Sequence, residues 1–323
     1  MNKFKKIGLT ALAGSLVATS VFAGTLDVSG GASMEVQNNS NASKGKVFTM
    51  GNSVNFAGTT ELDNGLTVSM KFELDDGALS GAGGPFDSHS MKIASDSLGT
   101  FTFHGHGGSS GQSAVDDTAT GDFWDNGFNS GTSVVVKALG GVTSATSDNM
   151  MTYALPTIMD DVAINTSYVP RGTGEYEASV DVAVAYTGVD GLTVGYAMGE
   201  DNATKGSQAD VDTMYASYAF SSFTVALTQT DKDSISTATD ADREYMGYAI
   251  TYTANPDLSI KYGGSSHETP NDTTDSDEEV EGITASYTTG GMTISTKMID
   301  MNNSGGVGTN DYSMWELAAS FAF

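Results

Sequence analysis

Short and long connections alternate along almost the whole chain, and this alternation restricts the fold more than any other feature of the sequence. Glycine, proline, asparagine and aspartate gather in short clusters that predict tight turns, and a longer polar stretch separates each cluster from the next. The tight turns are predicted at 63–65, 96–99, 156–160, 188–190, 221–222, 255–257 and 290–291, and the long loops at 38–45, 79–87, 107–147, 170–176, 201–208, 232–240, 266–277 and 302–310. These connections delimit sixteen strands in up-and-down order, with short turns at one end and long loops at the other.

The segments between the connections alternate in character with a period of two, which indicates β-strands with one apolar face. In 66–74, for example, Leu66, Val68 and Met70 share one face, while Ser69 and Lys71 lie on the other. No window after residue 23 has the roughly 18 apolar residues that a membrane-spanning helix needs. If the chain crosses a bilayer, it therefore does so as a closed antiparallel β-barrel.

Aromatic residues recur on the apolar faces of strands just before the short turns. A β-sandwich would also alternate, but it would place its aromatic residues in a core rather than at strand ends. Aromatic rings at one end of every second strand are typical of the girdle where a transmembrane barrel meets the membrane surface. The predicted girdle consists of Tyr153, Tyr186, Tyr218, Phe220, Tyr252, Tyr287, Phe321 and Phe323.

The first 23 residues have the pattern of a secretory signal peptide. A basic start is followed by an apolar stretch, and small residues precede the expected cleavage after Ala23. We therefore expect a single mature barrel domain over 24–323.

Three of the 14 basic residues lie in the signal, which leaves 11 against 40 acidic residues and a formal charge of −29. This charge excludes nucleic acid as a partner and favours attraction of cations. The absence of cysteine argues against a disulfide-stapled secreted fold.

At this point the chain resembles the general porins of the Gram-negative outer membrane, the sixteen-stranded trimeric kind found in proteobacteria. The matching pieces are the closing strand "SMWELAASFAF" with terminal Phe323, the hairpins "GNSVNFAGTTELDNGLTVSMKFEL" and "HSMKIASDSLGTFTFHGH", and "NMMTYALP" after the longest loop. The resemblance implies a homotrimer in the outer membrane, contact with its lipids and lipopolysaccharide, and recognition of the last strand by the barrel assembly machinery. It also implies a third long loop that folds into the channel.

The third loop, 107–147, is far longer than the others, and loops of this length are usually functional or disordered. We expect it to be a constriction loop whose aromatic residues, such as Trp124, pack on the inner wall. The alternative is a surface loop that covers the barrel mouth. Its carboxylates would line the narrowest part of the pore: Asp116, Asp117, Asp122 and Asp125.

The family pattern places a cluster of arginines opposite the acidic loop, and this sequence departs from it. The mature chain has only two arginines, Arg171 in a loop and Arg243 at the start of a strand. The candidates for the basic side of the pore wall are therefore mostly lysine and histidine: Lys71, Lys92, His104, His106, Arg243, Lys261 and Lys297. A thin basic wall facing a crowded acidic loop predicts preference for cations.

Other functions were weighed against a passive channel. His104 and His106 have a spacing that could hold a metal, but no third ligand is near in sequence, so we expect no metal site. The acidic loops offer at most weak calcium or magnesium binding, and no cofactor is expected. An outer-membrane hydrolase would need a spaced catalytic triad, which the sequence does not show. A surface anchor or adhesion protein is the main alternative, although most loops are short for a binding surface. We therefore predict a non-enzymatic porin for passive transport of ions and small hydrophilic solutes.

Overall fold

The structure of the protein is a computed structural model. The residues that it describes are 24–40, 45–75, 86–116, 148–157, 159–170, 177–202, 208–235, 242–268, 277–304 and 308–323. The predicted signal peptide, 1–23, lies outside the described residues.

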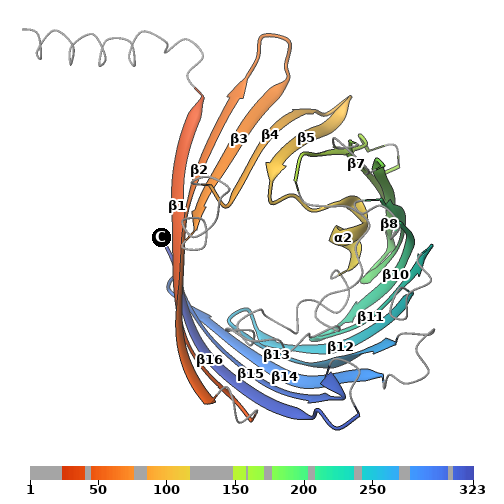
Figure 1. Cartoon of the computed structure of the whole chain (residues 1–323). Helices are drawn as coiled ribbons and strands as arrows, with labels where there is room; N and C mark the ends of the chain where they lie inside the picture. Colours follow the sequence, from red (N-terminus) through yellow and green to blue (C-terminus); the bar gives the residue numbers. More distant parts are fainter. Residues whose placement is uncertain are drawn as a thin grey trace, which may run out of the picture.

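Sixteen antiparallel strands form one closed barrel, as the sequence predicted (Figure 1). Each strand pairs with its neighbours in the chain, and β1 pairs with β16 to close the sheet. In the closing register Gln37 lies opposite Glu316 and Ala32 opposite Phe321. The strands are β1 Thr25–Asn39, β2 Gly45–Glu61, β3 Thr67–Asp75, β4 Ser88–Ser95, β5 Gly99–His106, β6 Met150–Ala154, β7 Val162–Val169, β8 Ser179–Val189, β9 Leu192–Asp201, β10 Ala209–Phe220, β11 Phe223–Ser234, β12 Arg243–Asn255, β13 Leu258–Glu268, β14 Glu278–Thr289, β15 Met292–Asn302 and β16 Tyr312–Ala322.

The short turns lie where the turn residues predicted them. Phe220 pairs directly with Phe223, so β10 and β11 are joined by Ser221 and Ser222 alone. Ser221 has a φ of 54°, which a two-residue hairpin turn of this kind requires. Between β14 and β15 the same requirement is met by Gly290 and Gly291, with φ values of 56° and 83°.

The chain turns inward after β5. Gly107, with a φ of 69°, follows the last residue of β5. A short helix, α2 (Gly111–Asp116), then lies inside the ring of strands (Figure 1). It contacts β7, β8, β9, β10 and β11. The sequence predicted an inward third loop but no helix within it. Within the described ranges, no helix has the length and apolar character needed to cross a membrane.

The position of α2 shows which face of the sheet lines the lumen and which faces outward. Residues that contact it, such as Ala183, Ala197 and Thr213, face the lumen. Because paired residues of antiparallel strands lie on the same face and successive residues alternate, the register assigns every paired strand residue to the inner or the outer face. The outer face is strongly apolar, and its large side chains are exposed, among them Val184, Met214 and Leu227.

A β-bulge interrupts this alternation near the end of β5. Ser90 pairs with His104, but His89 pairs with His106, so Gly105 is an extra residue in β5. Such an insertion shifts the following side chain to the other face. His104 therefore follows the inner register, whereas His106 follows the outer register of His89 and Phe72.

Candidate functional site

The lumen-facing wall of β7–β11 holds α2 through backbone and side-chain hydrogen bonds. The backbone N–H of Gly111 donates to Ser167 Oγ at 2.6 Å. Gln112 Nε2 donates to Thr213 Oγ1 at 2.5 Å, and the hydroxyls of Thr213 and Thr230 are hydrogen-bonded at 2.8 Å. The beginning of the third loop is thereby attached to strands β7, β10 and β11.

Apolar contacts complete this attachment. Val115 of α2 packs in a buried cluster with Ala183, Ala197 and Tyr215, and the partly buried Ala185 packs against the cluster. The small side chains of β8 and β9 leave room for the helix close to the strand backbones. Sequence reasoning missed Gln112 and Val115, because no period or motif in the loop sequence marks which of its residues reach the wall.

Of the four residues of the predicted acidic constriction, three lie outside the described residues. Asp116 is the last residue of α2, and its side chain is not described. Asp117, Asp122 and Asp125 lie outside the described residues, as does the rest of 117–147. The described beginning of the loop brings the chain into the lumen up to Asp116.

Two of the predicted basic residues, Lys71 on β3 and Lys92 on β4, lie on the inner face and are exposed to the lumen. Ser69 pairs with Lys92, and Lys71 pairs with Ser90, so the two ammonium groups belong to one patch of wall. Lys71 Nζ lies 3.7 Å from Glu73 Oε2, but its side chain remains 52% exposed. These two lysines are therefore available to attract or orient a passing solute.

The two histidines of the predicted basic wall are separated by the bulge at Gly105. His104 faces the lumen, and its Nε2 lies 3.2 Å from Thr152 Oγ1. His106, in the outer register, lies with Nδ1 2.6 Å from Asp148 Oδ1. Placing both histidines on the pore wall assumed a strand without a bulge. The extra residue, Gly105, puts His104 and His106 on opposite faces.

The remaining predicted bases face the lumen from β12, β13 and β15. Arg243 pairs with Lys232, which the sequence assigned to a loop although β11 continues to Ser234. Lys232 Nζ lies 2.8 Å from Asp201 Oδ2. Lys261 follows the same inner register on β13, between Thr251 and Thr284.

Lys297 is in a different situation from Lys71, because it lies beside a buried carboxylate. Its side chain is only 15% exposed, and its Nζ is 3.9 Å from Glu316 Oε1. Gln37 Nε2 donates to the other oxygen of Glu316 at 3.1 Å. Lys297, Glu316 and Gln37 thus form a polar network across the seam that closes the barrel.

Charge is unevenly divided between the two faces of the sheet. On the inner face carboxylates such as Glu73, Asp201 and Glu316 are interspersed with bases. On the outer face, the ends of β9–β15 nearest the long loops carry carboxylates without interspersed lysine or arginine among the described strand residues. We call this set the outer carboxylate belt: Glu200, Asp210, Asp212, Asp231, Asp233, Glu244, Glu268, Glu279, Glu281 and Asp300.

Tyrosine hydroxyls point toward the outer carboxylate belt from the apolar surface beside it. Tyr196 donates to Asp212 Oδ1, and Tyr248 and Tyr262 donate to the two oxygens of Glu281 at 3.0 and 3.2 Å. Their rings remain on the apolar face. An apolar ring with its polar tip directed to the edge is the arrangement expected at a membrane boundary.

The predicted girdle residues lie at the opposite edge of the outer face, near the short turns. The rings of Tyr218, Phe220, Phe223 and Tyr252 form a continuous row with centroid separations of 5.8, 5.8 and 5.0 Å. All eight residues predicted for the girdle are exposed: Tyr153, Tyr186, Tyr218, Phe220, Tyr252, Tyr287, Phe321 and Phe323.

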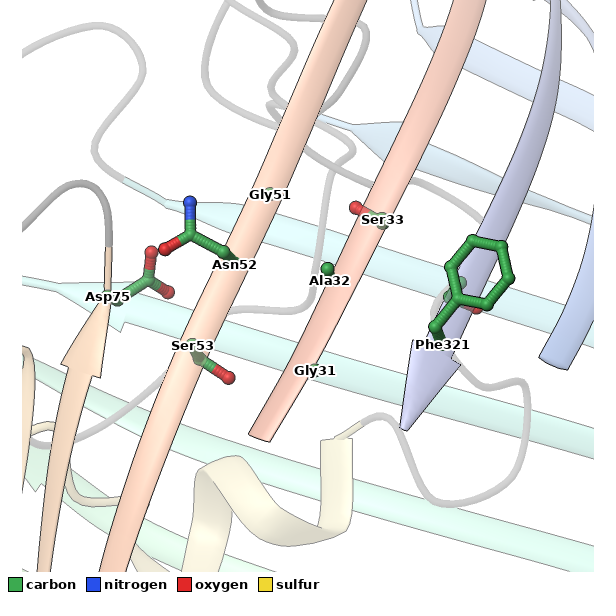
Figure 2. A pocket seen from close by; sticks show the side chains of 9 residues that line it. Gly31, Ala32, Ser33, Gly51, Asn52, Ser53, Asp75 and Phe321 are labelled. Atoms are coloured by element: carbon green, nitrogen blue, oxygen red, sulfur yellow. The ribbon is translucent and has the colours of Figure 1, made fainter. Parts of the chain in front are cut away.

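A hollow of about 330 Å³ lies at the closing seam, lined by small residues of β1 and β2 together with β3 and β16. Figure 2 shows Asn52 and Asp75 on one side of it and Phe321 on the other. Asp75 is the one charged side chain among its lining residues. Within the described ranges, no three His, Asp or Glu side chains are placed to hold a metal ion.

Comparisons with known proteins agree with this architecture. A family model described as "Gram-negative porin" matches residues 8–280. A solved porin structure superimposes with a TM-score of 0.69 at 17% identity, covering 93% of this chain and 100% of its own. Two engineered variants of the porin from Rh. blastica give TM-scores of 0.65 at 15% and 16% identity, with the same coverage. No match was found among curated protein sequences.

Proposed function

The chain belongs to the Gram-negative porin family, and on that premise we propose that it is a water-filled channel for passive diffusion of small hydrophilic solutes and ions across the outer membrane. The observation that carries the proposal is a closed sixteen-strand barrel with an apolar outer face and a polar inner wall. A barrel of sixteen strands is too wide for its own side chains to fill, so an aqueous path remains. In this proposal the protein carries out no chemical reaction.

The ion selectivity that we propose depends on where the charged residues lie. Among the described residues, the inner wall carries both signs of charge, so cation preference has to come from two other places. One is the third loop with Asp116, Asp117, Asp122 and Asp125. The other is the long-loop end, where the outer carboxylate belt lowers the electrostatic potential near the mouth. Rings of carboxylates favour cations, while Lys71 and Lys92 orient dipolar solutes from the opposite wall.

We propose that the barrel is a homotrimer and that β1–β3 provide part of the subunit contact. The outer faces of these strands lack the carboxylate belt and expose large apolar side chains, including Phe48 (81%) and Met50. The belted arc, β9–β15, would then face the lipids, where divalent cations can link carboxylates to lipopolysaccharide phosphates. We also propose that the signal at 1–23 directs export of the chain and that the barrel assembly machinery inserts it into the outer membrane.

Planar-bilayer recording tests the proposal directly. The purified mature protein should give stepwise single-channel conductance, and under a salt gradient its reversal potential should show cation preference. A correctly folded barrel that never conducts would overturn the channel assignment, and an anchored surface protein would then fit better. Conductance with a reversal potential of zero would retain the channel and overturn only the cation preference.

A further inference from the structure

We infer that Gln112 is the positioning residue that holds the beginning of the third loop against the channel wall, and that Gly195 and Tyr215 form the seat that allows it. The inference rests on the proposed channel function, since it concerns the element that narrows the lumen. It assigns a role to residues far from the predicted acidic constriction.

Gln112 is completely buried although it lies inside a water-filled lumen. Its amide donates to Thr213 Oγ1, and that hydroxyl is free to donate its own hydrogen to Thr230. Thr213 and Thr230 are also fully buried. Loss of the Thr213 hydroxyl would remove one hydrogen bond of a fully buried amide, and a lost buried hydrogen bond is unfavourable. The hydrogen-bonded position of α2 is therefore strongly preferred over nearby positions on the same wall.

The apolar contact between α2 and the wall depends on Gly195 of β9, which pairs with Tyr215 of β10. The ring of Tyr215 lies where a side chain of Gly195 would be, because a Cβ atom on Gly195 would collide with Cε1 of that ring. Gly195 thus lets the ring lie flat along the wall, where it packs against Val115. A larger residue at 195 would push the ring into the space that α2 occupies.

The start of the helix lies equally close to β8. A Cβ atom on Gly111 would come within 2.8 Å of Asp181 Oδ1, so a glycine at this position allows the close approach. The helix is therefore fixed on the β7–β11 side of the lumen. The exposed lysines, Lys71 and Lys92, lie on β3 and β4, outside the five strands against which α2 mainly packs. A shift of α2 away from this wall would therefore move the described beginning of the third loop toward the side of the lumen that carries Lys71 and Lys92.

The test compares Thr213→Val with Thr213→Ser in the full-length mature protein. Valine keeps the shape but removes the hydroxyl, whereas serine keeps the hydroxyl. We expect Thr213→Val to increase open-channel current fluctuations, and Thr213→Ser to behave like the unaltered protein. Gln112→Ala should resemble Thr213→Val. Gln229→Ala, which changes the same residue type on the outer face of β11, is the matched control and should have no effect.

A second measurement, the reactivity of an introduced thiol, does not depend on conductance. The chain has no cysteine, so Ser110→Cys would introduce a single thiol at a site that is 1% exposed. With Thr213→Ser the thiol should stay protected from a maleimide, and with Thr213→Val it should react roughly fivefold faster, as expected for loss of one hydrogen bond. Gly195→Ala should accelerate the reaction as well.

The outcomes separate this inference from the proposed function. Equal current fluctuations and equal thiol reactivity in the folded valine and serine variants would overturn the role of Gln112, even in a protein that conducts. A protein that does not conduct would overturn the channel, while the thiol reactivity would still decide whether Gln112 holds the loop.

Discussion

Lys297 and Glu316 lie side by side on the inner wall, with Nζ 3.9 Å from Oε1. Glu316 also accepts a hydrogen bond from Gln37 across the closing seam. We predict that Glu316→Ala destabilises the folded barrel by about 2 kcal/mol, since it removes a buried carboxylate that accepts from Gln37 and lies beside the Lys297 ammonium group. Urea unfolding in lipid vesicles measures this, and Glu279→Ala on the exposed face is the control. Equal stability of the two variants would contradict the prediction.

Charge removal at Lys71 and Lys92 should increase cation preference. Each ammonium group changes the energy of an ion roughly 7 Å away by about 0.6 kcal/mol in water, or roughly threefold in the permeability of that ion before screening, with opposite sign for cation and anion. The double variant Lys71→Gln, Lys92→Gln is measured by reversal potential. Lys46→Gln on the outer face of β2, which the barrel wall separates from the lumen, should shift the potential less than the double variant. A shift caused by Lys46→Gln alone would show that the face assignment does not govern selectivity.

Replacing the acidic third-loop residues with asparagine should have the opposite effect. Asp116, Asp117, Asp122 and Asp125 changed together to asparagine should lower the cation-to-anion permeability ratio at least threefold, by the same Coulomb estimate. A second variant tests the other proposed source of cation preference by changing four carboxylates of the outer belt to asparagine: Asp210, Asp231, Asp233 and Asp300. If only this second variant alters selectivity, the long-loop mouth rather than the loop determines it.

The proposed subunit contact can be tested with cysteines placed in this cysteine-free chain. Met50→Cys on β2 should give covalent multimers with a short bismaleimide, because that face is expected to meet a second copy. Leu227→Cys lies on the lipid-facing arc and should remain monomeric on denaturing gels. The reverse pattern would move the contact to β9–β15.

Close packing at Gly264 gives a prediction about stability. A Cβ atom there would come within 2.5 Å of the carbonyl oxygen of Val280, which is backbone and cannot move aside easily. Gly264→Ala should therefore lower stability by about 1–3 kcal/mol, the usual effect of overpacking. At Gly31 the nearest atom would be 3.4 Å away. Gly31→Ala should be nearly neutral, and unfolding midpoints of the two variants make the comparison.

The barrel could be predicted from the sequence because strand number depends on local signals. Turn residues such as Gly290 and Gly291 adopt conformations that few other residue types favour, and each strand carries its own apolar period. The polar face of 66–74 likewise identified Lys71 as lumen-facing. These features need no knowledge of which strand pairs with which.

The site was less predictable because it depends on contacts between distant segments. Lys297 pairs with Glu316 on the neighbouring strand, and Gln37 reaches the same carboxylate only once β1 meets β16. The opposite faces of His104 and His106 follow from one unpaired glycine, and nothing in the alternation marks a bulge. Gln112 resembles any polar loop residue until the loop lies against Thr213.

The pairing of β1 with β16 has a consequence for the order of folding. These strands are separated by almost the whole chain, so their contact carries the largest loop-closure penalty in the molecule and should form last. Until then the hairpin of β1 and β2 presents an open edge that can pair with a foreign strand. The residues that make the seam specific, Gln37 and Glu316, are therefore also the ones that should determine whether a newly made chain closes on itself or aggregates with its neighbours.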